Sequence, residues 1–364
     1  MKPLYIVGTQ RDVGKTTLAL GLLHAFRQRG MKVAYTKPLG QRITTENGHV
    51  LHDDARVVAH FLELGDENGV EMAIPLPAGR VEKEIKDLHT DLLLKKVVDA
   101  CAALASTHDA VIVEAMGHVA MGSCLGLSTA EVAKGIGARA LLVSGGGIGR
   151  AIDEISLCQT FLKARGADMM GVVVNKVFQD KYARIKEATT RGLAILGTRS
   201  YGTVPFEESL VCPTMKQVHA HLGGELLGGR QHMVHRVHRT IVAAMEADNM
   251  IRYITEGTLV ITPGDRSDNI LAALSMHMIG ETEGPLISGM ILTGGIRPGE
   301  MVLRLIKDSH LSVLLVEEDT YSVASKLRQT TFKMTPEDKE RFNWAVCVIA
   351  EYVDIDGILK ALEA

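Results

Sequence analysis

Apolar and polar residues alternate with two different periods along the first 202 residues of the chain. Short runs rich in valine, isoleucine and leucine predict buried strands. The longer stretches between them, such as 15–28 and 91–106, repeat apolar residues every three or four positions and predict amphipathic helices. Their alternation predicts an α/β fold, in which helices flank a parallel sheet through right-handed crossovers. The predicted strands are Leu4–Val7, Lys32–Thr36, Ala110–Val113, Arg139–Ser144 and Gly171–Val174.

The alternation breaks between about residues 210 and 231, where glycines and Pro213 interrupt it. We expect a linker with one short helix here. The pattern then resumes in a second, smaller α/β domain, whose last long helix is predicted to start at Thr335-Pro336. The expected domains are 1–208 and 235–364, joined by a linker over 209–234. In the second domain we expect strands at 259–262, 287–292 and 312–316 and helices at 268–279 and 300–309.

Composition narrows the class of protein. Lys and Arg number 40 against 43 Asp and Glu, a balance typical of neither nucleic-acid-binding nor disordered chains. Hydrophobic residues make up 46% of the 364 positions, enough for packed interiors and a subunit interface. We find no membrane span and no signal peptide, and five widely spaced cysteines suit a reducing compartment. We therefore expect a cytoplasmic protein without a membrane or nucleic-acid partner.

The most informative segment follows the first predicted strand and opens the first predicted helix. It reads Gly-Thr-Gln-Arg-Asp-Val-Gly-Lys-Thr-Thr over residues 8–17, with one residue more between its glycines than the usual G-x-x-x-x-G-K-[ST] pattern. In such a loop backbone N–H groups and the helix N-terminus hold phosphate, the lysine reaches the β- and γ-phosphates, and the threonine binds magnesium. A glycine-rich turn that only caps the helix is the alternative. The predicted nucleotide contacts are Gly8, Thr9, Asp12, Val13, Gly14, Lys15, Thr16 and Thr17.

Three further side chains are expected at the same edge of the sheet. Lys37 follows the second predicted strand, Glu114 ends the third, and Asp54 opens a predicted helix. The carboxyl ends of parallel strands face one ligand crevice, so Lys37 is expected near Lys15. Glu114 and Asp54, with Thr16, are the candidate magnesium ligands. An exposed loop lysine, a helix cap and a solvated carboxylate are the alternatives.

Together these segments resemble the dethiobiotin-synthetase-like P-loop family, including its longer loop. The matching segments are the loop, Thr36–Leu39, Asp53–Ala55 and Val111–Glu114, within about residues 1–205. The resemblance implies a Mg-ATP site in which Lys15 and Thr16 bind phosphates and metal, Lys37 faces substrate and γ-phosphate, and Asp54 and Glu114 help hold the metal. It also implies that Asn175 contacts the adenine base and that Pro205 belongs to a second segment that contacts the base.

The second half of the chain carries two motifs, Thr-Pro-Gly-Asp-Arg-Ser-Asp at 262–268 and Leu-Thr-Gly-Gly at 292–295. They resemble the motifs of the DRTGG domain. A dethiobiotin-synthetase-like domain followed by a DRTGG domain resembles the N-terminal, non-catalytic part of long bacterial phosphate acetyltransferases. In those enzymes an acetyltransferase domain follows, and the chain has no room for one before Ala364, so we expect no acetyl transfer from it.

Three functions follow from these resemblances. The first is a nucleotide-responsive regulatory or scaffold protein that binds Mg-ATP, forms a dimer and works with a protein partner in acetyl-phosphate metabolism. The second is an ATP-dependent ligase, with Lys15 and Lys37 as catalytic residues while a carboxylate or carbamate attacks the γ-phosphate. The glycine-rich turn of dethiobiotin synthetases is replaced here by residues 115–118, Ala-Met-Gly-His, and this difference weakens the ligase hypothesis. The third is a structural module, against which the intact Gly14-Lys15-Thr16 argues.

Two smaller groups of residues stay ambiguous. Asp265, Arg266 and Asp268 form either an anion or nucleotide pocket or a helix cap, with Asp268 as N-cap, and Gly294-Gly295 predicts a tight strand-to-helix turn. Five histidines lie near the expected linker and are either metal ligands or ordinary exposed side chains. They are His219, His221, His232, His235 and His238.

Overall fold

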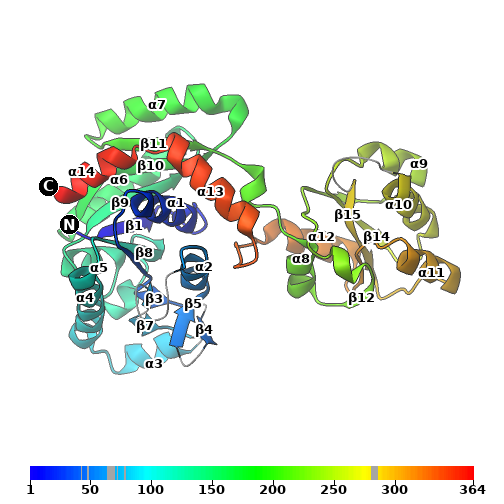
Figure 1. Cartoon of the computed structure of the whole chain (residues 1–364), viewed down its shortest axis with the longest axis horizontal. Helices are drawn as coiled ribbons and strands as arrows, with labels where there is room; N and C mark the ends of the chain where they lie inside the picture. Colours follow the sequence, from blue (N-terminus) through cyan, green and yellow to red (C-terminus); the bar gives the residue numbers. More distant parts are fainter. Residues whose placement is uncertain (42, 47–48, 64–69, 72, 78, 280–285) are drawn as a thin grey trace. The chain divides into compact units, whose positions relative to one another are not determined.

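A computed structural model describes residues 1–41, 43–46, 49–63, 70–71, 73–77, 79–279 and 286–364. The chain folds into two compact units (Figure 1). The first contains residues 1–207 together with 334–364, and the second contains residues 208–333. The second unit is therefore inserted in the sequence of the first.

The first unit is built on a seven-stranded sheet in which all neighbouring strands are parallel, in the order β11-β10-β9-β1-β8-β2-β6. The five predicted strands are all present, and two of them run several residues further than expected. The strands are β1 (Leu4–Gly8), β2 (Val33–Thr36), β6 (Val70–Glu71), β8 (Ala110–His118), β9 (Arg139–Gly145), β10 (Asp168–Val177) and β11 (Ser200–Pro205).

Helices cover both faces of this sheet, as predicted, and each face has its own apolar core. One face carries α1 (Lys15–Gln28), α2 (Asp53–Phe61), α13 (Lys339–Tyr352) and α14 (Ile355–Glu363). The other carries α4 (Thr90–Thr107), α5 (Thr129–Gly135), α6 (Gly149–Ala164) and α7 (Tyr182–Ile195). The remaining elements are α3 (Arg80–Lys86), the strand pairs β3 (Leu39–Gly40) with β7 (Ile74–Pro75) and β4 (Ile43–Glu46) with β5 (His49–His52), and 3-10 turns at 123–125 and 179–181.

The two C-terminal helices belong to the first unit. The second domain was expected to extend to residue 364, and this expectation was wrong, because the second unit ends at residue 333. Figure 1 shows both helices against the first unit, with α14 in red close to the N-terminus. Phe342 of α13 stacks on Phe61 with ring centroids 4.6 Å apart, and Ile349 packs against Gly21 of α1. A Cβ at Gly21 would lie 2.4 Å from the Cβ of Ile349, so the glycine permits this close helix contact. Apolar spacing predicts that a helix face is buried, but it does not identify the surface that covers it.

The last long helix also starts later than predicted. Thr335 donates from its backbone N–H and its hydroxyl to Asp338 Oδ2, at 2.9 and 3.2 Å. This turn precedes α13, whose first residue is Lys339. The Thr-Pro pair therefore enters the helix through a turn and does not cap it.

The second unit has a five-stranded sheet in the order β12-β16-β15-β14-β13, parallel except for the edge pair β12 with β16. The predicted short helix, α8, packs Met215 and Val218 into the core of this unit, so 209–234 is not a linker. The strands are β12 (Glu225–Gly228), β13 (Arg239–Val242), β14 (Thr258–Pro263), β15 (Ile287–Thr293) and β16 (Val313–Leu315). The helices are α8 (Met215–Leu222), α9 (Ala247–Met250), α10 (Ser267–Ile279), α11 (Glu300–Asp308) and α12 (Thr320–Gln329), with 3-10 turns at 208–210, 230–232 and 251–253.

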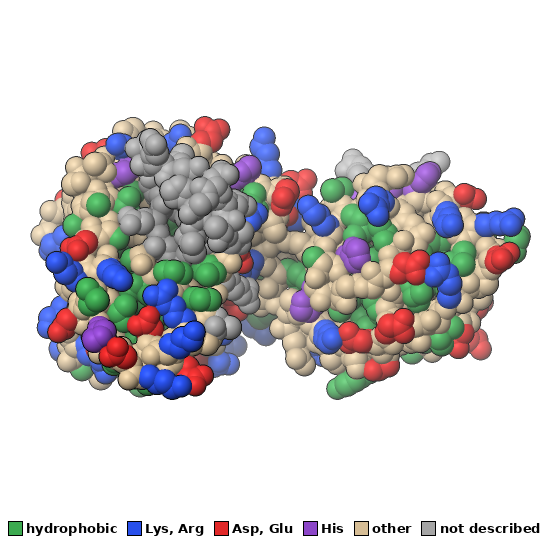
Figure 2. Space-filling view, turned by 90° about the horizontal axis from the view of Figure 1, so that it is seen from below, with side chains coloured by type: hydrophobic (Ala, Val, Ile, Leu, Met, Phe, Trp, Pro, Cys, Tyr) green, Lys and Arg blue, Asp and Glu red, His purple; other side chains and the backbone are tan. Residues whose placement is uncertain are grey.

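Surface charge, the composition of the helices and the state of the cysteines add three findings. On the faces shown in Figure 2, basic and acidic side chains of the described residues are interspersed. Among the helices of the described ranges, none is long and apolar enough to cross a membrane. The five cysteines are all free thiols, in agreement with the widely spaced pattern in the sequence.

Candidate functional site

The loop over residues 8–17 connects β1 to α1 in the strand-loop-helix context that the sequence predicts. Gly14 is the residue before α1 and has a left-handed backbone with φ of +97°. A Cβ there would lie 2.1 Å from Nδ2 of Asn175, and a Cβ at Gly8 would lie 2.6 Å from the carbonyl oxygen of Gln10. Both glycines are thus required by the path of the backbone. The N–H of Thr9 donates to the Val143 carbonyl at 2.9 Å and so attaches the start of the loop to β9.

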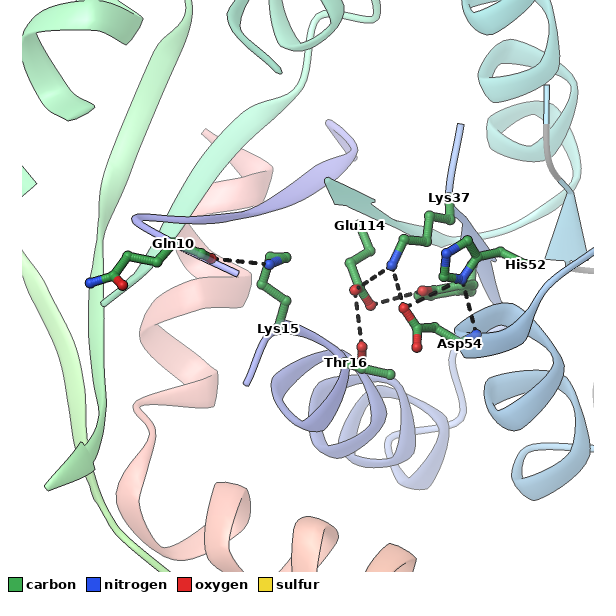
Figure 3. A network of polar contacts seen from close by, with 8 residues as sticks. Gln10, Lys15, Thr16, Lys37, His52, Asp54 and Glu114 are labelled. Atoms are coloured by element: carbon green, nitrogen blue, oxygen red, sulfur yellow. Dashed lines mark hydrogen bonds and ion pairs between the residues drawn. The ribbon is translucent and has the colours of Figure 1, made fainter. Parts of the chain in front are cut away.

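Lys15 lies at the N-terminus of α1 with only 7% of its surface exposed. Its ammonium is 3.5 Å from the carbonyl oxygen of Gln10 (Figure 3). Burial lowers the pKa of Lys15 to about 8, and the nearby Lys37 adds to this shift, although the carboxylates of Glu114 and Asp54 oppose it. A bound anion would stabilise the charged form of Lys15. The site is therefore suited to phosphate.

The other predicted side chains form one buried network beside the loop (Figure 3). Glu114 Oε1 accepts hydrogen bonds from the Thr16 hydroxyl and the Lys37 ammonium, both at 3.0 Å. The Lys37 ammonium also contacts Asp54 Oδ2. Burial by itself lowers the pKa of Lys37, but Glu114 and Asp54 outweigh it, so that the pKa is raised and the lysine stays charged. The structure thus brings together Lys15, Thr16, Lys37, Asp54 and Glu114, as predicted.

Two residues of this network were missed by sequence reasoning. The Tyr35 hydroxyl donates to Glu114 Oε2 at 2.8 Å from the strand that precedes Lys37. His52 is the N-cap of α2, and its Nδ1 accepts from the Asp54 N–H at 3.0 Å, which orients the first turn of that helix. Tyr35 lies in an apolar strand, where the pattern predicts a buried core residue, so only the fold reveals its polar contact. A histidine before Asp-Asp at a helix start was a usable signal for His52.

The donor set suits one kind of metal. Among the described residues, no three His, Cys, Asp or Glu side chains are placed to hold a metal ion by themselves. The Thr16 hydroxyl with the Glu114 and Asp54 carboxylates matches Mg²⁺, which keeps several waters and is bound through one or two carboxylates plus phosphate oxygens. The residues present therefore fit a magnesium ion that arrives with a phosphate ligand.

Asn175 lies in β10 and touches the phosphate loop. Its Nδ2 donates to the Val13 carbonyl at 2.9 Å, and its Oδ1 accepts from the Lys176 N–H at 2.8 Å. Pro205 pairs with Val177 across β10 and β11, so it lies on the neighbouring strand. Their predicted contacts with a base stay predictions. Thr17 lies in the first turn of α1.

The stretch after Glu114 continues as a strand. β8 extends to His118 beside Gly8 of β1, so residues 115–118 form no glycine-rich turn. The replacement of this turn is the point on which the sequence weakened the ligase hypothesis.

The ambiguous motifs of the second unit make local contacts. Arg266 forms two hydrogen bonds with Asp268, at 2.9 and 2.7 Å, and this pairing lowers the pKa of Asp268 to about 2. Since α10 begins at Ser267, Asp268 lies inside its first turn and is not the N-cap. Gly294 and Gly295 have φ of +82° and +65° and form the predicted tight turn.

The five sequence-adjacent histidines do not come together as a set. His232 lies 3.4 Å from His235, between Nδ1 and Nε2, and its ring centroid is 6.1 Å from that of His310. His219 and His221 lie on α8 and contact the Gly224 carbonyl and Thr330.

Comparison with known proteins assigns the family. A family model described as an AAA domain matches residues 2–214, more than half of the chain. The chain belongs to the AAA domain family. A DRTGG domain model matches residues 217–330 of this AAA domain protein, which confirms the predicted order of a P-loop domain and a DRTGG domain. Residues 331–364 lie outside both matches, and most of them return to the first unit.

The AAA domain protein is also similar to curated phosphate acetyltransferases. It is 27% identical to that of Pseudomonas putida, with 97% of this chain and 51% of the relative covered. It is 28% identical to that of Nitratidesulfovibrio vulgaris, with 96% and 50% covered, and 28% identical to that of Deinococcus radiodurans, with 97% and 50% covered. The chain thus spans about half the length of these relatives.

Solved structures show more distant similarity. The cell division protein MinD of Pyrococcus horikoshii, complexed with Mg-ADP, is 15% identical with a TM-score of 0.38, and 57% of this chain and 83% of that chain are covered. The CBS and DRTGG domains of a Clostridium perfringens pyrophosphatase, complexed with the activator diadenosine tetraphosphate, are 22% identical with a TM-score of 0.28, and 34% and 49% are covered.

Proposed function

We propose that the protein binds Mg-ATP at the loop over residues 8–17 and acts as a nucleotide-responsive regulatory or scaffold protein. One observation carries this proposal: a phosphate-type loop and a buried hydroxyl, ammonium and carboxylate network meet at one edge of the parallel sheet. Buried ionisable side chains are expensive to maintain and concentrate at functional sites.

Each group has a role that its chemistry suits. The N-terminus of α1, with its partial positive charge, and the ammonium of Lys15 would hold the phosphates. Thr16, Glu114 and Asp54 would hold magnesium, which when bound neutralises phosphate charge. Lys37 already neutralises both carboxylates, so a magnesium ion held by them would have to compete with this ammonium. Binding of Mg-ATP would therefore have to rearrange the network.

The route from the nucleotide to the rest of the chain supports a regulatory role. Lys15 and Thr16 lie in the first turn of α1, and Gly21 of the same helix packs against α13. The second unit contains the DRTGG domain match and is called the DRTGG unit from here on. α13 follows in the sequence soon after this unit ends at Lys333. A shift of α1 on nucleotide binding would thus act on the segment that re-enters the first unit from the DRTGG unit. Such a shift would give α13 the two positions that allosteric coupling requires.

A ligase similar to dethiobiotin synthetase is the second candidate, and Lys37 favours it. This lysine is a second buried cation beside the loop lysine, as expected for a site that neutralises charge in phosphoryl transfer. In that reaction a substrate carboxylate or carbamate oxygen bonds to the γ-phosphorus and ADP leaves. An amine then attacks the acyl carbon of the acyl phosphate and inorganic phosphate leaves.

Calorimetric titration with Mg-ATP, followed by a phosphate-release assay on the same samples, separates these functions. The variants are Lys15→Ala and, as a matched control, Lys181→Ala at an exposed position. Binding that is lost only in Lys15→Ala, without phosphate release, is expected for the regulatory protein. Binding with release favours a ligase or an ATPase, and substrate screening with Lys37→Ala follows. No binding by the wild type at millimolar Mg-ATP refutes both functions.

Three further properties belong to this proposal. We place the protein in the cytoplasm as a dimer, with a partner in acetyl-phosphate metabolism; the similarity to phosphate acetyltransferases supports the choice of partner. Light scattering after size-exclusion chromatography, with and without Mg-ATP, measures the assembly state. Co-purification with the cell's own phosphate acetyltransferase or acetate-activating enzymes tests the partner.

A further inference from the structure

Two consecutive side chains of β10 hold two consecutive carbonyl groups of the phosphate loop. Asn175 Nδ2 donates to the Val13 oxygen at 2.9 Å, and the Lys176 ammonium donates to the Asp12 oxygen at 2.6 Å. These contacts join positions 162 and 164 residues apart in the sequence. The roles proposed above for the loop do not account for Lys176.

The backbone of β10 is distorted where these residues lie. The pairing with β11 shifts between Val174 and Val177, which pair with Thr203 and Pro205, so the two residues between them face only one residue of β11. This irregularity is of the bulge type, which re-aims side chains. Lys176 adopts φ of +60°, an unfavourable left-handed conformation for a residue with a side chain. The backbone is thus strained at the residue whose side chain contacts the phosphate loop.

The contacts determine how the loop presents its donors. In a trans peptide the C=O and the following N–H point in opposite directions. The Asp12 and Val13 carbonyls turn toward β10, so the N–H groups of Val13 and Gly14 turn away from it. Backbone N–H groups are the anion-binding groups of such loops. Asp12 has φ of +56° and Gly14 has φ of +97°, so this loop path needs restraint from outside.

We propose that Lys176 is a positioning residue which, with Asn175, holds the phosphate loop in its anion-binding shape before any ligand arrives. Burial lowers the pKa of Lys176, partly opposed by Asp12, as expected for an ammonium that is partly shielded from water beside the loop. The ligand in this inference rests on the proposed function, whereas the restraint of the free loop does not. Lys176 therefore acts on the phosphate-binding part of any nucleotide and not on its base.

The restraint is tested on the free protein by hydrogen exchange of a peptide covering residues 9–15. Lys176→Met keeps the side-chain stem and the backbone strain but removes the ammonium. Lys181→Met is the control, at an exposed lysine five positions further along the chain. We expect exchange of the loop to rise about 10- to 100-fold in Lys176→Met, the loss of one charge-assisted hydrogen bond, and to stay unchanged in the control. Unchanged exchange in Lys176→Met overturns the proposal.

Titrations with Mg-ATP and with magnesium tripolyphosphate, which has no base, then test the role in binding. Both ligands should lose affinity by the same factor in Lys176→Met, and Lys176→Arg should recover part of it. A loss for ATP alone would mean that Lys176 contacts the nucleoside and would overturn the proposal. If the wild type binds neither ligand, the proposed function fails and the exchange experiment alone decides on the restraint. Equal far-UV circular dichroism of all variants shows that they fold.

Discussion

Replacing Lys37 with methionine tests whether charge holds the buried network together. The Lys37 ammonium contacts Asp54 and lies 3.0 Å from Glu114, and the two carboxylate side chains are 6% and 1% exposed. Methionine keeps most of the volume but leaves two buried carboxylates without their cation. Removing one partner of a buried ion pair costs about 3–5 kcal/mol, because the remaining charge stays buried. For a unit of this size the Tm should fall by about 6–20 °C.

Trp344 provides the assay, since it is the single tryptophan of the chain and lies in α13 of the same unit. Its fluorescence is followed on heating for the wild type, Lys37→Met and the control Lys163→Met, at an exposed position of α6. Adding Asp54→Asn to Lys37→Met should recover part of the Tm. Millimolar Mg²⁺ should stabilise Lys37→Met more than the wild type, because the carboxylates are then free of the ammonium. A Tm of Lys37→Met within about 2 °C of the wild type would refute the reasoning.

Three other predictions concern both units. Gly14→Ala would place a Cβ 2.1 Å from Asn175 Nδ2 at φ of +97°. It should therefore abolish tripolyphosphate binding in calorimetry and lower the free energy of unfolding by about 1–3 kcal/mol. Gly21→Val should lower the unfolding free energy by about 1–3 kcal/mol, measured by Trp344 fluorescence in urea, because it pushes Ile349 of α13 away. The DRTGG unit should lose stability as the pH falls from about 7.5 to about 5.5, measured by hydrogen exchange of β14 and β15.

The direction of the pH effect follows from two histidines. Burial, with His232 and His277 adding, lowers the pKa of His235 below its ordinary 6.5. Burial, with His232 and His310 adding, likewise lowers the pKa of His277, against an opposing effect of the Ile287 and Ser309 backbone. The unfolded chain therefore binds protons first, and stability is full above about pH 6.5 and declines toward the folded-state pKa values. His277→Gln should flatten the pH profile, and an unchanged profile would contradict this explanation.

For the glycine variants, each control is an alanine or valine at a glycine with open space around the added Cβ. Gly197→Ala has no atom within 4 Å of the new Cβ and shares the positive φ of Gly14. It should cost stability through strain alone and leave phosphate binding unchanged. Equal loss of phosphate binding in both variants would show that general destabilisation, and not the contact with Asn175, is the cause. Gly149→Val in α6 is the open-space control for Gly21→Val.

The sequence by itself determined five of the seven strands in the sheet of the first unit and most of its site. Apolar runs and the loop motif predicted β1, α1 and the positions of Lys15 and Thr16, because local spacing encodes these elements. Lys37 and Glu114 were predicted to meet at the same edge, since parallel strands put their carboxyl ends together. In the DRTGG unit the tight turn at Gly294-Gly295 followed from glycine's tolerance of positive φ.

Only the tertiary structure decided which surfaces cover one another. The apolar faces of α8 and α13 are visible in the sequence, but hydrophobic burial has no direction and does not choose between two cores. The structure places α8 in the DRTGG unit and α13 on the first unit, against both expectations. The contacts of Tyr35 with Glu114 and of Lys176 with Asp12 join residues 79 and 164 positions apart. Whether a hydrogen bond forms depends on the positions of donor and acceptor to within a few tenths of an ångström, and a pattern along the chain does not contain these positions.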